Sequence, residues 1–168
     1  MLYERLRALG IAWVGYEHVP VFTVEEAAAV NAGQPGGHTK NLFLKDKKNQ
    51  LWLVVLRDDF KLDLNALSKQ LGSPRFSFGS GELLVRTLGV PPGSVTPFAL
   101  INDPGHKVRV VLDKAMLGDE PLNYHPLRND RTIAVSAADL LGFIAACGHQ
   151  PLVLSLPSGD AKEEPAAL

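Results

Sequence analysis

One lysine, Lys40, lies within an apolar run that predicts a β-strand over residues 39–44. Residues two apart in a strand share a face, so Lys40 lies on the same side as Leu42 and Leu44. If these leucines face the core, the ammonium group points inward or into a cleft, where an anion or a polar group has to meet it. The alternative is a lysine at the strand end whose side chain reaches the solvent.

A second candidate is the proline-rich segment 91–97, which reads Pro-Pro-Gly-Ser-Val-Thr-Pro. Its prolines stiffen the chain, and between them Gly93, Ser94, Val95 and Thr96 keep their backbone N–H groups. A rigid loop with several free amides can hold a carbonyl oxygen and stabilise the oxyanion that forms on it. The plainer interpretation is an ordinary connection between a helix and a strand.

A third candidate is His125, which precedes Pro126. The proline holds the preceding backbone extended and so fixes the direction of the imidazole. This side chain can orient a substrate group or a water, although a lone histidine is more often a hydrogen-bonded structural residue. The same ambiguity applies to Asn102, Asp103 and Asn129, since such residues commonly cap turns.

The familiar hydrolase and metal-binding motifs are missing. Cys147, with His149 two residues on, could suggest a nucleophile, but this cysteine closes an apolar helix and suits a small buried side chain. The sequence has no Gly-x-Ser-x-Gly, His-Glu-x-x-His or Cys-x-x-Cys motif. We therefore expect no metal and no cofactor.

The composition indicates one globular domain. The 168 residues are 46% hydrophobic and 21% charged, which suffices for a substantial core. The net charge of −1 means that contact with nucleic acid has to come from a local basic patch. A single cysteine fits a reducing cytoplasm, and no apolar run approaches the roughly 20 residues of a membrane span. We expect the domain to occupy residues 1–155 and residues 156–168 to form a flexible tail.

Short helices and short strands alternate along the chain. Residues 23–26, Thr-Val-Glu-Glu, form a capping box for a helix over residues 24–31, and Asp63, Ser80 and Ser136 cap three more helices. The predicted strands are residues 39–44, 51–56, 98–102, 108–113, 131–135 and 151–154. This pattern predicts an α+β fold with a mixed, largely antiparallel sheet curled towards a barrel and helices packed outside.

The first two strands flank a polar turn and predict a β-hairpin. Lys45, Lys47 and Lys48 gather on or beside that turn. They form either a solvated rim of the hairpin or an edge that contacts RNA phosphates, and the amino-acid composition is compatible with both interpretations.

Taken in order, these motifs resemble those of the YbaK/prolyl-tRNA synthetase editing-domain (INS-like) superfamily. The motifs are Thr-Lys-Asn-Leu at 39–42, Gly-Ser-Val-Thr-Pro-Phe at 93–98, Asn-Asp at 102–103 and His-Pro at 125–126, followed by Asn129 and Thr132. The resemblance spans residues 1 to about 155 and is greatest to the freestanding alanyl-tRNA(Pro) deacylases, called ProXp-ala or PrdX. The cysteine-specific branch typically has Thr where this chain has Asn41.

The resemblance implies a trans-editing aminoacyl-tRNA deacylase, a carboxylic ester hydrolase that removes alanine from mischarged Ala-tRNA(Pro). A synthetase pocket built for proline rejects the smaller alanine poorly, because each missing methylene is worth only about 1–3 kcal/mol. A second sieve that excludes proline by size removes the error. Hydrolysis in this family is substrate-assisted, since a hydroxyl of the terminal adenosine is thought to help activate the water.

The resemblance also assigns roles to residues. Lys40 matches the family's functional lysine and is assigned to the terminal phosphate or nearby polar groups, while the amides of residues 93–96 hold the scissile carbonyl. His125 matches a histidine that helps to bind the aminoacyl-adenosine end. The other residues expected at the substrate are Asn41, Pro97, Phe98, Val24 and Leu42.

The implied partner is tRNA(Pro), bound through its acceptor stem and its aminoacyl-adenosine end. Lys45, Lys47 and Lys48 are the expected contacts to the stem, which would be recognised mainly by shape. A prolyl-tRNA synthetase or an elongation factor as protein partner stays open. So do two other functions: hydrolysis of Cys-tRNA(Pro) or of several small amino acids on tRNA, and a non-catalytic tRNA-binding module that kept the fold.

Overall fold

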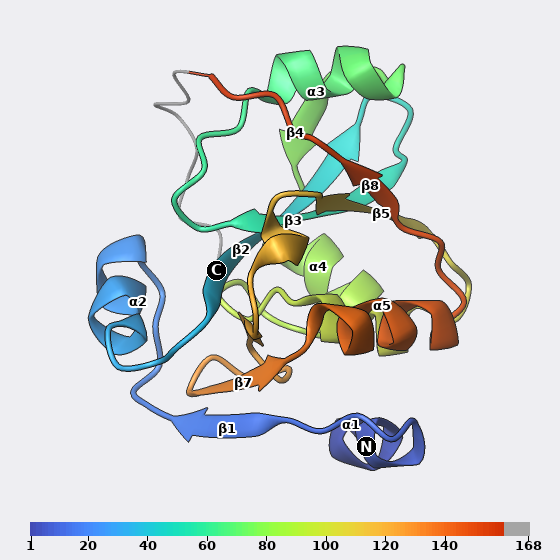
Figure 1. The fold of residues 1–168 in the computed structure, drawn as a ribbon. Coiled ribbons are helices and arrows are strands. Elements are labelled where there is room, and N and C mark those ends of the chain that lie inside the picture. Colours follow the sequence, from blue (N-terminus) through green and yellow to red (C-terminus); the bar gives the residue numbers. More distant parts are fainter. Residues whose placement is uncertain (160–168) are drawn as a thin grey trace.

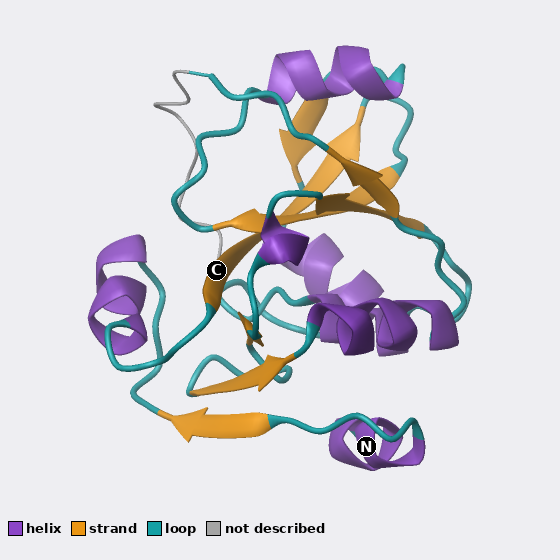
Figure 2. Ribbon diagram, viewed as in Figure 1, coloured by secondary structure: helices purple, strands orange, loops and turns teal. Residues whose placement is uncertain are grey.

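The computed structural model describes residues 1–159 and shows one mixed sheet with helices around it (Figure 1 and Figure 2). The strands are β1 (Val14–Glu17), β2 (Gly37–Asp46), β3 (Leu51–Arg57), β4 (Phe76–Phe78), β5 (Val108–Asp113), β6 (Leu122–Tyr124), β7 (Arg131–Val135) and β8 (Leu152–Leu154). The α-helices are α1 (Leu2–Ala8), α2 (Val24–Asn31), α3 (Leu64–Leu71), α4 (Gly81–Leu88) and α5 (Ala137–Ala146). Two short 3₁₀ helices, η1 (Pro97–Asn102) and η2 (Met116–Gly118), complete the described chain.

The sheet is open. Its eight strands run in the order β1-β7-β6-β2-β3-β5-β8, and β4 pairs with β2 beside this path. Four pairings are antiparallel and three are parallel. Because β1 and β8 each have only one neighbour, the sheet does not close into a barrel. The predicted α+β class with helices outside a mixed sheet is confirmed.

β2 is the strand that joins the two halves of the sheet. Its first residues pair in parallel with β6, its middle pairs with β3 in the predicted hairpin, and its last residues pair with β4. The strand therefore passes from one half of the fold to the other, and its side chains alternate between two environments.

These two environments are separate hydrophobic cores. Phe43 and Val55 belong to the larger core, which includes residues of α5 and η1. Leu42 and Leu44 belong to a second core that includes Leu67 of α3. Figure 1 shows α3 and α5 on opposite sides of the central strands. Neighbouring residues of β2 thus face opposite sides of the sheet, so a pocket on one side of the sheet is not reached by all of them.

The predicted helix starts are confirmed by their capping bonds. The side chains of Thr23, Asp63, Ser80 and Ser136 each accept a hydrogen bond from the backbone N–H three residues later. Each such cap is worth about 0.5–2 kcal/mol. The starts of these helices could therefore be predicted from the sequence, because each depends on a hydrogen bond between residues three apart.

The prediction of a strand over residues 98–102 is wrong, because this segment is the 3₁₀ helix η1. The Thr96 hydroxyl accepts a hydrogen bond from the Phe98 N–H, and Pro97 occupies the first turn, where its missing N–H costs nothing. Phe98, Ala99 and Leu100 are all buried, so the run shows no alternation that separates a helix from a strand.

Three strands were missed altogether: β1, β4 and β6. Each has only three or four residues, too few for a period-two pattern to stand out. β1 and β6 both pair with β7, so the half of the sheet that carries the candidate site was only partly predicted.

Part of the predicted tail packs on the body of the protein. Leu156 is buried in the core next to α3, and the Pro157 carbonyl accepts a hydrogen bond from the Asp63 N–H. The remaining tail residues, 160–168, lie outside the described residues. Across residues 1–159, none of the helices has the length and apolar character required to cross a membrane.

Candidate active site

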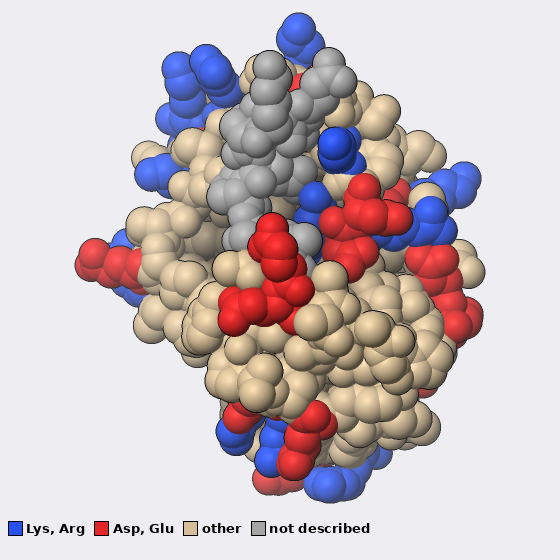
Figure 3. All heavy atoms as spheres, turned by 90° about the vertical axis from the view of Figure 1, so that its left-hand side faces the viewer, with Lys and Arg blue, Asp and Glu red and all other residues tan. Residues whose placement is uncertain are grey.

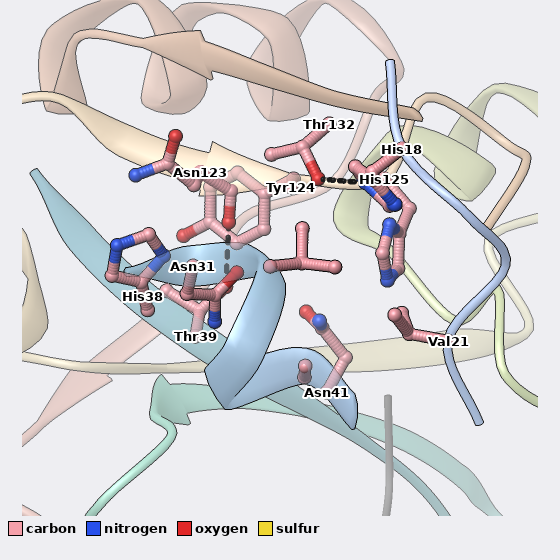
Figure 4. A pocket seen from close by; sticks show the side chains of 12 residues that line it. His18, Val21, Asn31, His38, Thr39, Asn41, Asn123, Tyr124, His125 and Thr132 are labelled. Carbon is pink, nitrogen blue, oxygen red and sulfur yellow. Dashed lines mark hydrogen bonds between the residues drawn. The ribbon is translucent and has the colours of Figure 1, made fainter. Parts of the chain in front are cut away.

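A small cavity lies between α2 and the sheet face formed by β2, β6 and β7 (Figure 4). Its free volume is about 30 Å³, room for about one or two water-sized groups. The apolar side of the cavity is made by Val21, Ala27 and Val30. The other lining residues are His18, Asn31, His38, Thr39, Asn41, Asn123, Tyr124, His125 and Thr132. None of the lining residues is an aspartate, glutamate, lysine or arginine.

Three residues of β2 line the cavity. His38 reaches it at the start of the strand, and Thr39 and Asn41 line it further along, while Lys40 between them does not. Lys40 shares its strand face with Leu42, which is completely buried in the core next to α3. The structure therefore brings the predicted Asn41 into the cavity and places the Lys40 side chain on the opposite face of the strand.

His125 follows β6 and presents one ring nitrogen to the cavity. Its Nδ1 lies 2.9 Å from the carbonyl oxygen of Arg131 and donates to it, so in the neutral ring Nε2 keeps its lone pair. Burial is the main cause that lowers the pKa of His125 below its ordinary value. The bond to Arg131 opposes this effect and the nearby His18 adds to it. His125 is thus held as a neutral acceptor near pH 7.

His18 and Thr132 form a second polar pair in the cavity. The Nδ1 of His18 lies 2.8 Å from the Val19 carbonyl oxygen, which assigns its proton to that nitrogen. Its Nε2 then accepts from the Thr132 hydroxyl, 2.8 Å away. The Thr132 proton is committed to this bond, so the lone pairs of Oγ1 remain available. Figure 4 shows this pair beside His125.

The two asparagines of the cavity differ in how they are bonded. Asn123 donates both amide hydrogens, to the carbonyl oxygens of Pro35 and Gly37 at 3.1 and 3.0 Å, and so holds the start of β2. Asn41 is only 3% exposed, and its Oδ1 has no hydrogen-bond donor among residues 1–159. Figure 4 shows the Asn41 amide directed into the cavity.

The loop over residues 93–97 adjoins the cavity wall without lining the cavity. A Cβ on Gly93 would lie 3.2 Å from the Phe22 ring and 3.4 Å from the Asn129 amide. Asn129 in turn donates to the carbonyl oxygen of Val21, a wall residue. Within residues 1–159, the backbone amides of Gly93, Val95 and Thr96 have no acceptor, while that of Ser94 donates to Pro91.

Three predicted substrate neighbours lie elsewhere. Phe98 packs edge-on against Tyr124 and Phe143 in the larger core, with ring centroids 5.9 and 5.2 Å away. Pro97 is buried in the first turn of η1, and Leu42 belongs to the core beside α3. Val24 begins α2, but its side chain lies outside the described residues.

A wider open groove of about 570 Å³ adjoins the cavity at His38. It contains Arg57, which bonds both carboxylate oxygens of Asp119 at 2.8 and 2.9 Å. Burial raises the pKa of Asp58 in the same groove, and the nearby His38 and Lys40 partly offset the rise. Its acidic side chains outnumber its arginine, which does not suit a phosphate. No three His, Cys, Asp or Glu residues in the described chain are grouped so as to hold a metal ion.

The basic hairpin lies at the far end of β2 from the cavity. Lys47 and Lys48 are exposed in the turn and Lys45 is half-buried. At about 3.3 Å per residue, Lys45 lies roughly 13 Å along the strand from Asn41. Figure 3 views the side of the molecule that carries α2 and shows basic side chains on its upper part and again along its lower edge, with acidic side chains and a largely uncharged area between them.

Sequence analysis overlooked His18 and the wall residues Ala27 and Val30, and it noted Thr132 only through the resemblance. The available signal was the position of His18, shortly before a proline and a capped helix. The pairing of β1 with β7, which sets Tyr16 opposite Thr132, brings that segment to the site.

Comparison with known proteins places this arrangement in a family. The family model described as "Aminoacyl-tRNA editing domain" matches residues 18–143. The prolyl-tRNA synthetase associated domain-containing protein 1 of Mus musculus is 42% identical over 159 residues, covering 92% of this chain and 94% of that protein. The prolyl-tRNA editing protein ProX of Acetoanaerobium sticklandii is 37% identical over 146 residues, covering 86% and 89%. The crystal structure of the hypothetical protein APE2540 superposes with a TM-score of 0.74 at 23% identity, covering 92% of this chain and 97% of that one.

Proposed function

This chain belongs to the aminoacyl-tRNA editing domain family, and from that premise we propose that it is a trans-editing deacylase that hydrolyses Ala-tRNA(Pro). The family and the relatives connect it with aminoacyl-tRNA editing and with the fidelity of translation. The observation that carries the finer proposal is the cavity under α2. It is small, it holds neutral hydrogen-bonding groups, and it lies where the family model matches.

The size of the cavity supports alanine as the amino acid removed. Its free volume suits a group near the size of a methyl, and Val21, Ala27 and Val30 give that group apolar contacts. The proline ring would have to displace one of these walls. Cognate Pro-tRNA(Pro) is therefore spared because its side chain does not fit, while alanine enters.

The chemistry is hydrolysis of the ester between the amino acid and the terminal ribose. A water oxygen bonds to the carbonyl carbon, the bond from that carbon to the ribose oxygen breaks, and the ribose oxygen takes up a proton. The products are the free amino acid and an unesterified tRNA. A neighbouring ribose hydroxyl of the substrate helps to activate the water, and His125 accepts a hydrogen bond from the aminoacyl-adenosine end through Nε2.

The proline-rich loop is proposed to stabilise the oxyanion. The amides of Gly93, Val95 and Thr96, which have no acceptor within residues 1–159, support this role. Preorganised amides stabilise charge that develops in the transition state and typically contribute about 2.7–4 kcal/mol for each donor. Since Gly93 lies close to Phe22 and Asn129, and Asn129 bonds to the wall residue Val21, a small movement of α2 and its leading segment would bring the carbonyl to the loop.

Lys40 is proposed to contact the terminal phosphate of the tRNA. Its position on the face of β2 away from the cavity fits a role outside the amino-acid pocket. The lysine would fix where the backbone of the 3′ end runs and so position the ester beside the cavity. Asn41, one residue on, then faces the amino acid itself.

The test is deacylation of purified Ala-tRNA(Pro), Cys-tRNA(Pro) and Pro-tRNA(Pro) by the full chain. We expect release of alanine and not of proline, with kcat/KM reduced at least about 10-fold in Lys40→Ala and in His125→Ala. Lys114→Ala, which removes an exposed lysine after β5, serves as the matched control and should leave the rate unchanged. Release of cysteine alone would move the substrate to the cysteine branch, and hydrolysis of no substrate would leave a tRNA-binding module.

A further inference from the structure

The outer edge of β1 carries backbone groups that no described strand bonds. β1 has β7 as its single neighbour in the sheet, and Figure 1 shows it as the outermost strand at the bottom of the view. The His18 N–H, one residue past the strand, donates to the Asp130 carbonyl at 3.0 Å. Because bonded and non-bonded pairs alternate along an antiparallel ladder, Glu17 and Gly15 fall in non-bonded pairs with β7. Their N–H and C=O groups therefore point outward from the sheet.

Several apolar side chains are exposed along this edge. Val14 and Val19 are 58% and 69% exposed, and Tyr16 between them is partly exposed. Val14 and Tyr16 lie two residues apart, so they share one face of the strand. Tyr16 pairs with Thr132, which places both on the side of the sheet that carries the cavity. Neighbouring exposed apolar side chains beside unpaired backbone groups are typical of an interaction surface.

The other face of β1 borders an open groove of about 430 Å³ beside α1, and we call this the α1 groove. Gly15 leaves space in it, because a Cβ at this position would meet a single side-chain methyl at 4.0 Å. The Arg7 guanidinium lies 5.6 Å from the centre of the Trp13 ring and has no carboxylate partner within residues 1–159. Glu17 borders the same groove and bonds to Arg131 at 3.0 Å. The edge therefore presents both a cation and an anion, and Figure 3 shows both signs of charge along its lower edge.

We propose that β1 pairs with β1 of a second copy of this chain, so that the protein forms a symmetric dimer with one continuous sheet. A two-fold axis at Tyr16 sets Gly15 of each copy opposite the partner's Glu17. Both outward-facing residues of the strand are then paired, and each pair exchanges both of its N–H···O bonds. An axis at Glu17 would set like charges opposite each other. An axis at Gly15 would set Glu17 opposite the partner's Trp13, which lies before the strand.

On the cavity face, this register brings apolar side chains together. Tyr16 meets the partner's Tyr16 in a non-hydrogen-bonded pair, where the Cα atoms are about 4.5 Å apart and aromatic pairs are favourable. The exposed Val14 lies opposite the partner's His18. Because His18 lines the cavity, each copy adds an apolar side chain beside the candidate active site of the other.

On the groove face, the same register brings opposite charges together. The partner's Glu17 lies opposite Gly15, where no side chain occupies the space. It is also the diagonal neighbour of Trp13, and Arg7 lies over that ring. Arg7 thereby receives a carboxylate. The exposed Val19 falls opposite the partner's Trp13, so an apolar contact flanks the charged pair at each end of the interface.

Sedimentation equilibrium of the full chain over a concentration series measures the dimer. We expect the mass to rise from 18.2 kDa towards twice that value as the concentration increases. Gly15→Pro removes an outward N–H, a change that an edge strand tolerates, and Tyr16→Lys sets like charges opposite each other at the axis. Each variant should raise the Kd of the dimer at least about 5-fold. Val153→Lys, on the other edge strand β8, is the matched control and should leave the Kd unchanged.

A cysteine cross-link tests the register without depending on the affinity. The native Cys147 is first replaced by alanine. Tyr16→Cys should then form a disulfide between two copies on oxidation with diamide, because a Cα separation of about 4.5 Å lies within the disulfide range of about 4.4–6.8 Å. Glu17→Cys lies opposite the partner's Gly15 and should cross-link much more slowly. Circular dichroism checks that every variant is folded.

The outcomes decide between this dimer and its alternatives. A wild-type chain that stays monomeric up to about 1 mM would overturn the proposal. A dimer whose Kd changes less than about 5-fold in either folded variant would also overturn it, because the interface then lies on another surface. Cross-linking of Glu17→Cys as fast as that of Tyr16→Cys would contradict the register. None of these measurements uses tRNA, so the result does not depend on whether the chain hydrolyses Ala-tRNA(Pro).

Discussion

The imidazole of His125 can accept a hydrogen bond only while it is neutral, and its surroundings keep it neutral. Burial lowers its pKa, the bond to the Arg131 carbonyl partly restores it, and the nearby His18 lowers it further. Protonation would replace the lone pair at Nε2 with a hydrogen and place a positive charge in the cavity. The pH at which activity is lost therefore reports the state of this one ring.

We predict that kcat/KM for Ala-tRNA(Pro) falls on the acid side with a midpoint below about 6.5, the ordinary pKa of histidine. His18→Gln removes the neighbouring ring that lowers the pKa of His125, so the midpoint should move up. A pH profile of single-turnover deacylation measures both. A wild-type midpoint at or above the ordinary value would contradict this account.

The same pKa shift has a stability counterpart. Because the pKa of His125 is lower in the folded than in the unfolded chain, the unfolded chain binds the proton first as the pH falls. The free energy of unfolding should decrease once the pH drops below about 6.5 and stop decreasing below the folded-state pKa. Urea titrations of wild type and His125→Gln across this range should show a larger decrease in the wild type than in the variant.

A second prediction at the residue scale concerns the size of the cavity. Ala27 faces it from α2, and Ala27→Val adds two methyl groups to a free volume of about 30 Å³. We expect kcat/KM for Ala-tRNA(Pro) to fall at least about 10-fold. Ala29→Val on the exposed side of the same helix carries the same loss of helix propensity and serves as control. Equal losses in the two variants would mean that helix stability, not cavity volume, is responsible.

At this scale the sequence predicted the composition of the site better than its geometry. Asn41 and His125 were identified, and the structure brings them together. The strand period alone placed Lys40 beside Leu42, but it could not say which face of the strand carries the cavity. His18 was missed because it reaches the site through β1, a pairing of distant segments that no local pattern records.

Helices and hairpins could be predicted from the sequence where a short-range hydrogen bond or a turn determines where they begin. Capped helices and the central hairpin were predicted because caps and turns are determined by a few neighbouring residues. Residues 98–102 were misassigned because Phe98, Ala99 and Leu100 are all buried, which removes the periodicity that separates helix from strand. The three-residue strands β4 and β6 exist only because longer neighbours pair with them.

Two glycines allow a prediction at the scale of elements. Gly142 lies inside α5, and a Cβ there would meet no atom within 4 Å. Gly142→Ala should raise the free energy of unfolding by about 0.5–1 kcal/mol, because alanine loses less backbone entropy in a helix. Gly93→Ala should lower it by about 1–2 kcal/mol, since Gly93 has φ of +93° and an added Cβ would press on Phe22.

Urea unfolding of both variants measures the contrast, and deacylation adds a second readout. Gly142→Ala should keep full activity, whereas Gly93→Ala should lose it beyond what its stability explains, because the loop amides would be displaced. A Gly93→Ala variant that is destabilised but fully active would remove the loop from the proposed mechanism.

At the scale of the whole molecule, one half of the sheet carries the cavity and the other half carries the basic hairpin. The cavity is formed by α2 with β6, β7 and the first part of β2, and the hairpin of β2 and β3 extends away from it into the other half of the sheet. A chain with a net charge of −1 cannot hold tRNA by overall attraction, so a local cluster has to supply the contact. Lys45, Lys47 and Lys48 form such a cluster at the distal end of the strand that also carries Asn41.

We predict that replacing these three lysines with alanine weakens tRNA binding while leaving the chemical step intact. Each phosphate that a lysine no longer neutralises should make the slope of log(kcat/KM) against log salt concentration shallower by about 0.7–0.9, or about 2 to 3 in all. Turnover of a short 3′-terminal aminoacyl-nucleotide, which cannot reach the hairpin, should not change. Lys114→Ala is the control for the loss of one exposed positive charge. An unchanged salt slope in the triple variant would show that the hairpin is a solvated rim and that tRNA approaches the cavity over another surface.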